Sequence, residues 1–333
     1  MLAPSIGCQV TPLSFMARTS LLLSLAGLLL FSPRPGIAES SCRTVDLMPQ
    51  FFAVLDRSDH EDGQQKINDF RRSLVRPFGD LYGDSGVGFP SAPELDQAIL
   101  KALANAREQK VSLIKAHFLL RQKLNEQIGE FTKDFPDFSC NFPIYLLPAL
   151  GKLDGAGRVV NGKPALLFGV DNIAAEYSAE TLPIFLTHEL FHRYHFQVAG
   201  FSDDKGDKEI LWRTLWTEGL ATYMSKSLNP RASMQDALIL PKNLIDEATP
   251  RLPDLICRLM PHMDTSDPDT FRLFFMLHPD RGDVPPRVGY YIGALAASRI
   301  AEKKSLSSIA HMKPEQVRSE LESTLKTSTS CTR

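Results

Sequence analysis

The sequence carries little net charge and no concentration of charge of one sign. Its 333 residues include 37 Lys and Arg against 39 Asp and Glu, which gives a formal charge of −2. Proteins that bind nucleic acid or an anionic membrane surface by electrostatics need a basic patch or a basic overall balance. The composition therefore argues against a polyanionic partner, and we expect no nucleic acid among the ligands.

Internal repeats and low-complexity segments are also missing, apart from the polar tail from Thr327 to Arg333. Because 43% of the residues are hydrophobic and 23% are charged, the chain has enough apolar side chains to bury a substantial core. The composition excludes a largely disordered protein, and the length fits one large domain or two closely packed ones.

A hydrophobic run long enough to cross a bilayer stably is absent near the N-terminus. The apolar stretch from Leu21 to Phe31 is too short for that role, but it follows Arg18 and precedes the small residues Gly36-Ile37-Ala38. This arrangement is typical of a signal peptide, which predicts that residues 1–38 are removed and that the product is exported, periplasmic or secreted, without stable membrane insertion. An uncleaved anchor helix is the alternative, and translation could also begin at Met16.

Cysteine is scarce and lacks the close C-x-x-C spacing of a metal knuckle. Removal of the leader would take Cys8 with it. The cysteines that remain form an even set: Cys42, Cys140, Cys257 and Cys331. In a compartment where disulfides persist, this set predicts two structural disulfides, and three pairings are possible.

The first part of the mature chain, residues 39–140, predicts a helical region. Ser91 and Glu94 bracket Pro93 as a capping box with proline in the first turn. Apolar residues continue from there at helical spacing, which indicates one or two long amphipathic helices that end before Pro136.

Residues 141–228 differ in character from the region before them. Ile144–Leu147 and Ala165–Val170 are short apolar runs, and Asn161-Gly162 lies between them, which indicates strands and a hairpin. Helical patterns then return and continue through residues 229–333. We therefore expect an α+β fold that is predominantly helical, in which residues 141–228 form the core with a small β-sheet, flanked by N- and C-terminal helices.

The strongest motif is His188-Glu189-Leu190-Phe191-His192, an H-E-x-x-H sequence inside the helical stretch Leu182 to Val198. Residues four apart lie about 6 Å apart on one helix face, so both imidazoles can reach one cation. The glutamate beside the first histidine points to the edge of that face, where it can hold a metal-bound water. So short a motif also arises by chance, in which case the two histidines are incidental.

A second helical segment, Trp216 to Tyr223, offers a third ligand. Its Glu218 lies 26 positions beyond His192. Two histidines and a glutamate are an established ligand set of catalytic zinc, which keeps its fourth position for water. We therefore predict Zn²⁺ bound by His188, His192 and Glu218, with Glu189 as the general base. The alternative is a glutamate that is merely exposed on its helix.

His195 competes for the role of ligand because it shares a helix face with the other two histidines. Seven residues of rise place it about 10 Å from His188, too far for all three to meet one ion. We interpret His195 either as a catalytic residue on the substrate side or as an ordinary polar histidine.

These motifs together resemble those of the gluzincin clan of zinc metallopeptidases, the thermolysin-like and aminopeptidase-N-like enzymes. More narrowly, they resemble a group of bacterial predicted Zn-dependent proteases. The resemblance covers roughly Ile144 to Ile300 and rests on His188–His192, on Trp216–Ala221 and on Gly289-Tyr290-Tyr291-Ile292-Gly293. It implies a zincin-like core and a peptide or protein substrate.

The resemblance implies two further features. An edge strand before the metal helix would pair with an extended substrate, and Ala165–Val170 holds that place in the order, although a plain buried strand fits equally well. A later tyrosine would donate a hydrogen bond to the oxyanion, and we favour Tyr290 over Tyr291; both could instead be core aromatics. Gly289, Gly293 and Ala297 recur at helical spacing, which predicts close packing against another helix.

The sequence thus predicts an exported zinc-dependent metallopeptidase. Zinc would activate a water, and Glu189 would take its proton and pass it to the leaving amine. Tyr290 or His195 would stabilise the oxyanion. Two alternatives stay open: a zinc hydrolase of non-peptide substrates, and an exported zinc-binding protein without turnover, whose site would be closed by four protein ligands.

Overall fold

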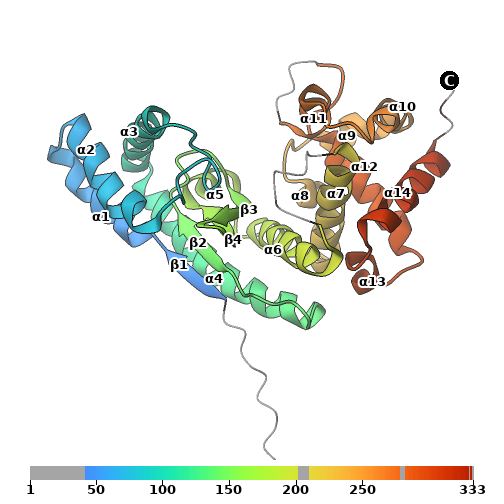
Figure 1. Cartoon of the computed structure of the whole chain (residues 1–333), viewed down its shortest axis with the longest axis horizontal. Helices are drawn as coiled ribbons and strands as arrows, with labels where there is room; N and C mark the ends of the chain where they lie inside the picture. The colour runs from blue at the N-terminus through green and yellow to red at the C-terminus, as the bar shows by residue number, and fades with distance from the viewer. Residues whose placement is uncertain (1–41, 202–209, 278–281, 330, 332–333) are drawn as a thin grey trace, which may run out of the picture. The chain divides into compact units, whose positions relative to one another are not determined.

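The computed structural model describes residues 42–201, 210–277, 282–329 and 331. These residues belong to one compact unit (Figure 1). The predicted signal peptide lies outside the described residues. Within the described ranges, every helix is too short or too polar to cross a membrane.

A four-stranded sheet forms the β part of the fold, in the order β1-β2-β4-β3. β1 (Arg43–Asp46), β2 (Pro143–Leu147) and β4 (Lys163–Gly169) are parallel. β3 (Gly155–Val160) pairs antiparallel with β4 at one edge. Parallel strands are buried on both faces and are therefore continuously apolar, as the central run of β4 is. The predicted α+β class, predominantly helical with a small sheet, is confirmed.

The turn between β3 and β4 is the hairpin that the sequence predicts. Asn161 and Gly162 have φ angles of 49° and 71°, and a two-residue hairpin turn of this kind requires positive φ at both positions. Asparagine and glycine adopt such angles at low cost.

The expectation that Ala165–Val170 forms an edge strand for substrate is wrong. Residues 165–169 lie in β4, which pairs with β2 on one side and with β3 on the other. Because both rows of its backbone groups are used in the sheet, β4 has none to offer a substrate. The free edge nearest the metal helix belongs instead to β3.

Helices precede and cover the sheet. Ser91 caps α3 by accepting a hydrogen bond from the backbone N–H of Glu94 at 3.4 Å. The Glu94 carboxylate accepts from the Ser91 hydroxyl and not from its backbone N–H, so only half of the predicted capping box forms. α4 ends at Asp134, two residues before Pro136, as the sequence predicts. The helices of this region are α1 (Met48–Arg57), α2 (Gly63–Phe70), α3 (Ala92–Glu108), α4 (Lys110–Asp134) and α5 (Val170–Glu176).

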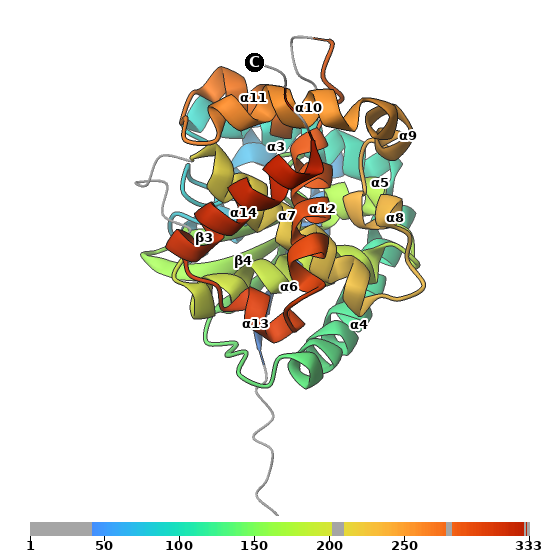
Figure 2. The ribbon, with the colours of Figure 1, turned by 90° about the vertical axis from the view of Figure 1, so that its right-hand side faces the viewer.

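The rest of the chain is helical, and α6 (Leu182–Ala199) connects the two parts of the fold by lying between the sheet and α7 (Leu211–Leu228), as Figure 1 shows. α12 (Val288–Ala301) and α14 (Pro314–Ser328) pack on α7 (Figure 2). Shorter helices complete the region: α8 (Met234–Leu238), α9 (Leu244–Ala248), α10 (Leu252–Leu259), α11 (Pro268–Phe275) and α13 (Leu306–Ala310).

The contact between α7 and α12 is made by backbone against backbone. A Cβ atom on Gly219 would lie 2.2 Å from the carbonyl carbon of Gly293, and one on Gly293 would lie 2.1 Å from the carbonyl oxygen of Leu215. Only glycine fits at either position. The close helix packing that the small residues predict is therefore confirmed, and it positions the segment of α7 that carries Glu218.

Two disulfides join parts of the chain that are distant in sequence. Cys42 pairs with Cys140, with Cα atoms 5.1 Å apart, and Cys257 pairs with Cys331, with Cα atoms 5.5 Å apart. The prediction of two disulfides is confirmed, and this pairing is one of the three that the sequence allows. Two disulfides fit an oxidising, exported location.

Candidate metal centre

The H-E-x-x-H motif lies in the middle of α6, which is buried along most of its length. Pro183 occupies the first turn, where its missing N–H is not needed, and Gly200 follows the last turn in a left-handed conformation with φ of 81°. The helix therefore places His188 and His192 one turn apart on one face. Both imidazoles are largely buried, with 9% and 12% of their side-chain surface exposed.

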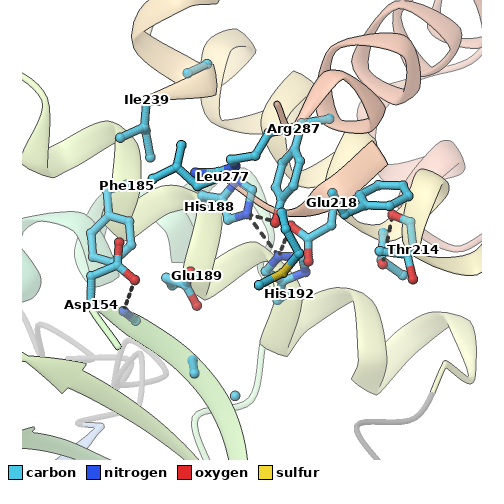
Figure 3. A pocket seen from close by; sticks show the side chains of 18 of the residues that line it. Asp154, Phe185, His188, Glu189, His192, Thr214, Glu218, Ile239, Leu277 and Arg287 are labelled. Carbon is cyan, nitrogen blue, oxygen red and sulfur yellow. Dashed lines mark hydrogen bonds and ion pairs between the residues drawn. The ribbon is translucent and has the colours of Figure 1, made fainter. Parts of the chain in front are cut away.

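Three ligand atoms converge at this point, two from α6 and one from α7 (Figure 3). The Nε2 atoms of His188 and His192 are 3.0 Å apart. The Oε2 atom of Glu218 lies 3.3 Å from the first and 3.4 Å from the second. Atoms bound tetrahedrally to a zinc ion at 2.0–2.1 Å would be about 3.3 Å from one another. The expectation that Glu218 meets the two histidines is confirmed, and this buried group has the geometry to bind a metal ion.

The electrostatics of the three residues favour a cation between them. Burial alone would raise the pKa of Glu218, but the two histidines outweigh it and hold this pKa well below its usual range. Burial also lowers the pKa of His188, although Glu218 opposes the change. Burial would also lower the pKa of His192, but Glu218 outweighs it and raises this pKa. Metal binding uses the ionised carboxylate and the neutral His188 as they are, and it displaces the proton that His192 binds in the absence of metal.

Among the described residues, none forms a hydrogen bond with the second ring nitrogen of His188 or His192. The Nδ1 atoms of His188 and His192 are buried without a partner among the described residues. Ligating histidines usually donate this N–H to a carboxylate or carbonyl that fixes the ring. Here ring orientation is set by packing instead: the two imidazoles meet edge to face with their centroids 4.6 Å apart.

Glu189 lies beside the three ligand atoms but contributes none of them. In Figure 3 its carboxylate lies between Asp154 and His192. Its burial raises the pKa of the carboxyl to about 7. The first residue of β3, Gly155, fits against it so closely that an added Cβ would lie 2.8 Å from Cγ and 2.9 Å from Cδ of Glu189. The start of β3 therefore determines where this carboxylate can stand.

Gly155→Ala is expected to lower turnover by tenfold or more while the metal stays bound. The new methyl group would also meet Cζ of Phe185 at 2.5 Å, so Glu189 has to shift, and a misplacement of about 1 Å can cost about a hundredfold in rate. Metal content and kcat of the purified variant check this. The matched control is Gly129→Ala on α4, where an added Cβ meets nothing within 4 Å. Equal activity of Gly155→Ala and the native protein would show that β3 does not position Glu189.

The ligand atoms and Glu189 open into a pocket of about 640 Å³. Its walls are β3 and the residues just before it, α6, α7, the start of α12, and the segments around the ends of α8 and α11. Among the described residues, His188, His192 and Glu218 are the only group of three or more side chains that could hold a metal ion. The site therefore offers three protein ligands and keeps one side open to the pocket.

The structure distinguishes the two candidate tyrosines of α12. Tyr290 lines the pocket, and burial, reinforced by Glu218, raises the pKa of its hydroxyl above the ordinary value. The hydroxyl of Tyr291 lies 3.2 Å from Oγ1 of Thr249 and outside the pocket lining. Tyr290 is thus the tyrosine that faces the ligand atoms.

The structure does not bring His195 to the site. Its side chain is fully buried and packs between Phe191 and Phe201, with ring centroids 5.6 and 4.7 Å away. Both ring nitrogens lack a partner among the described residues, and burial lowers the pKa to about 3, so the ring is neutral. His195 does not line the pocket, and its expected role on the substrate side is corrected to one in the apolar interior.

The pocket also contains residues that the motifs do not point to. Tyr177 donates a hydrogen bond to Oδ2 of Asp154 at 2.5 Å, and the other carboxylate oxygen accepts from the backbone N–H of Gly155 at 2.8 Å. Arg287, the N-cap residue just before α12, lines the pocket with its guanidinium 4.1 Å from the ring centroid of Tyr290. Its place two residues before Gly289-Tyr290-Tyr291 is the one signal in the sequence that could have identified it.

Comparisons with protein-family models, with curated proteins and with solved structures found no match to this chain. No family is therefore shown for it, and a functional assignment depends on the geometry of the site.

Proposed function

We propose that this protein is an exported zinc-dependent metallopeptidase with a gluzincin-type site. The observation that carries the proposal is the convergence of Nε2 of His188, Nε2 of His192 and Oε2 of Glu218 at 3.0 to 3.4 Å from one another. A second carboxylate, that of Glu189, stands beside them in an open pocket. A catalytic metal site needs both features: an open coordination position and a base within reach of it.

The donor set favours zinc over the hard cations. Calcium and magnesium prefer six or more oxygen ligands, whereas two imidazoles and one carboxylate suit zinc. A bound zinc ion supplies Lewis-acid activation of water and of the scissile carbonyl. His188, His192 and Glu218 would hold it.

Glu189 is the general base of the proposed reaction. It accepts a proton from the attacking water and passes it to the nitrogen of the leaving group as the C–N bond breaks. A base is most effective when its pKa lies near the working pH, and burial raises the pKa of Glu189 to about 7. A neighbouring cation would lower that value again by favouring the ionised form.

Tyr290 is the oxyanion donor of the proposed reaction. A phenol keeps its proton at neutral pH, and burial raises the pKa of Tyr290 further, so its hydroxyl can donate a hydrogen bond to the oxygen of the tetrahedral intermediate. A donor placed in this way contributes about 3 kcal/mol to the stability of the transition state. This role now falls to Tyr290 alone, since His195 lies elsewhere.

The free edge of β3 supports a peptide as the substrate. Gly155, Ala156, Gly157 and Arg158 all line the pocket, and an extended peptide can add to an exposed strand edge through main-chain hydrogen bonds. The chain order of a sheet, the metal helix α6 and the glutamate helix α7 is the order expected of a zincin-like core. A structural zinc protein without turnover would need a fourth protein ligand, and the described residues provide three.

The test is metal content combined with digestion of a peptide library. The purified protein is expected to contain one zinc ion per chain and to cleave library peptides, and a chelator such as 1,10-phenanthroline should abolish cleavage until zinc is restored. Zinc bound at full stoichiometry in a protein that leaves every peptide intact would contradict a peptidase and favour one of the other two functions.

A further inference from the structure

Arg287 is a pocket cation that the proposed reaction does not use. Its side chain lines the pocket beside Tyr290, and the ring of that tyrosine faces the guanidinium at 4.1 Å. Figure 3 shows Arg287 and Glu218 on the same side of the pocket, where α7 and α12 meet. The Arg287 side chain therefore lies close to the proposed metal ligands His188 and Glu218.

No carboxylate of the described residues forms an ion pair with Arg287. Three acids have charges that act on Arg287. Glu218 and Asp154 are engaged elsewhere, and Glu176 is exposed to solvent on α5. Glu218 contacts the two histidines, and Asp154 accepts from Tyr177 and Gly155. A partly buried guanidinium has five N–H donors in a planar fork that matches a carboxylate, so the pocket holds an anion receptor with no anion of its own.

The backbone at Arg287 adds an independent observation. Its φ angle of 59° lies in the left-handed region, which is unfavourable for a residue with a Cβ atom and costs glycine little. Strained residues persist where the side chain is needed, and they cluster at ligand sites. The presence of arginine at this position is explained by a function of its side chain.

We infer that Arg287 binds a carboxylate of the substrate, so that the pocket selects peptides carrying a negative charge close to the scissile bond. The inference rests on the proposed peptidase function and adds its substrate class. The carboxylate is either the C-terminal group of the peptide or an acidic side chain. Two parallel N–H···O bonds from the guanidinium would hold it, because a planar carboxylate accepts both at once.

The test is a binding measurement that needs no turnover. Zinc-loaded protein with Glu189→Gln is titrated calorimetrically with three blocked dipeptides: acetyl-Leu-Phe with a free carboxylate, the same peptide as its amide, and acetyl-Leu-Glu amide. We expect at least one of the two acidic ligands to bind ten- to a hundredfold more tightly than the neutral amide, the usual range for a charge-assisted pair. The arm that shows the preference identifies the source of the carboxylate.

Variants assign the preference to the arginine. Arg287→Gln should remove it and leave binding of the neutral amide within a fewfold. Arg287→Gly should remove it as well and also relieve the backbone strain, so that its melting temperature is equal to or above that of the native chain. The control is Arg299→Gln, which makes the same charge change at an exposed position of α12.

Three outcomes would overturn the inference. The first is equal binding of the three ligands. The second is a preference that survives Arg287→Gln, which would assign it to the metal. The third is an equal loss of affinity for all three ligands in Arg287→Gln, which would assign the arginine to binding of a group that they share. None of these depends on whether the protein cleaves peptides, so failure of the inference is distinguishable from failure of the proposed function.

Discussion

Glu189→Gln is expected to retain one zinc ion per chain and to lose about a thousandfold or more in kcat. The side chain keeps its shape, and its atoms are not among the three that converge on the metal position, so metal binding has no reason to change. The amide cannot accept the proton of the attacking water, and removal of a general base costs about 10² to 10⁴ in rate. Elemental analysis and a fluorogenic peptide selected from the library measure the two quantities.

Loss of zinc together with activity would show instead that Glu189 supports the metal site, and retention of activity would remove it from the reaction. Tyr291→Phe is a suitable control, because this residue lies on α12 but outside the pocket. It should keep both metal and activity.

Glu189→Gln should also be more stable than the native chain at pH 8, when both proteins are free of metal. Burial raises the pKa of Glu189 from 4.5 to about 7, so ionisation is harder in the folded protein than in the unfolded one. Above pH 7 the folded state carries the full penalty, about 3 kcal/mol. Below pH 4.5 the carboxyl is protonated in both states and the penalty is absent. Urea unfolding should show a higher free energy of unfolding for Glu189→Gln than for the native chain at pH 8, and no such difference at pH 4.5.

Glu218→Gln is expected to lower the affinity for zinc by more than about a hundredfold. Changes to residues that only orient a metal ligand already cost about 10- to 100-fold, and Glu218 supplies a ligand atom and the only negative charge among the three ligands. Competition with a chromophoric chelator measures the affinity. Far-ultraviolet circular dichroism of the metal-free variant should be unchanged, since Glu218 lies on the surface of α7 that faces the pocket.

Glu176→Gln is the control for this change, because Glu176 is an exposed acid on α5 whose charge also reaches Asp154 and Arg287. It should bind zinc as the native chain does. Native affinity in Glu218→Gln would show that the third ligand is another group, and the proposed site would then be incorrect.

Local sequence patterns predict the parts of the site that lie within one helix. The spacing of His188 and His192 needs only the periodicity of α6, and the choice of Glu218 needs only the chemistry of zinc ligands. The long-range contacts are different. Glu218 reaches the histidines because α7 is fixed against its neighbours, partly through Gly219 and Gly293, and small residues predict close packing without identifying the partner helix.

The sheet shows where local patterns fail. β1 is only four residues long, and its partner β2 lies about a hundred residues away, so no local alternation marks it. β3 has two glycines and an exposed valine, so its sequence does not indicate a strand. β4 has a continuous apolar run, which does. Whether a strand lies at the edge or in the centre of a sheet depends on the order of the strands, and local sequence patterns do not predict that order. The burial of His195 likewise comes from aromatic neighbours, among them Phe201, that a helical pattern does not include.

The glycine contact between α7 and α12 allows substrate selectivity to be changed independently of zinc affinity. Gly219 follows the proposed ligand Glu218 directly, and Gly293 lies with Tyr290 on α12, which begins one residue after Arg287. Because main chain meets main chain there, α12 cannot slide along α7 without a clash. The side chain at 287 can therefore be changed without moving the helix that supplies Glu218. Libraries varied at this position should alter the selectivity and leave the zinc affinity unchanged, provided that both glycines are kept.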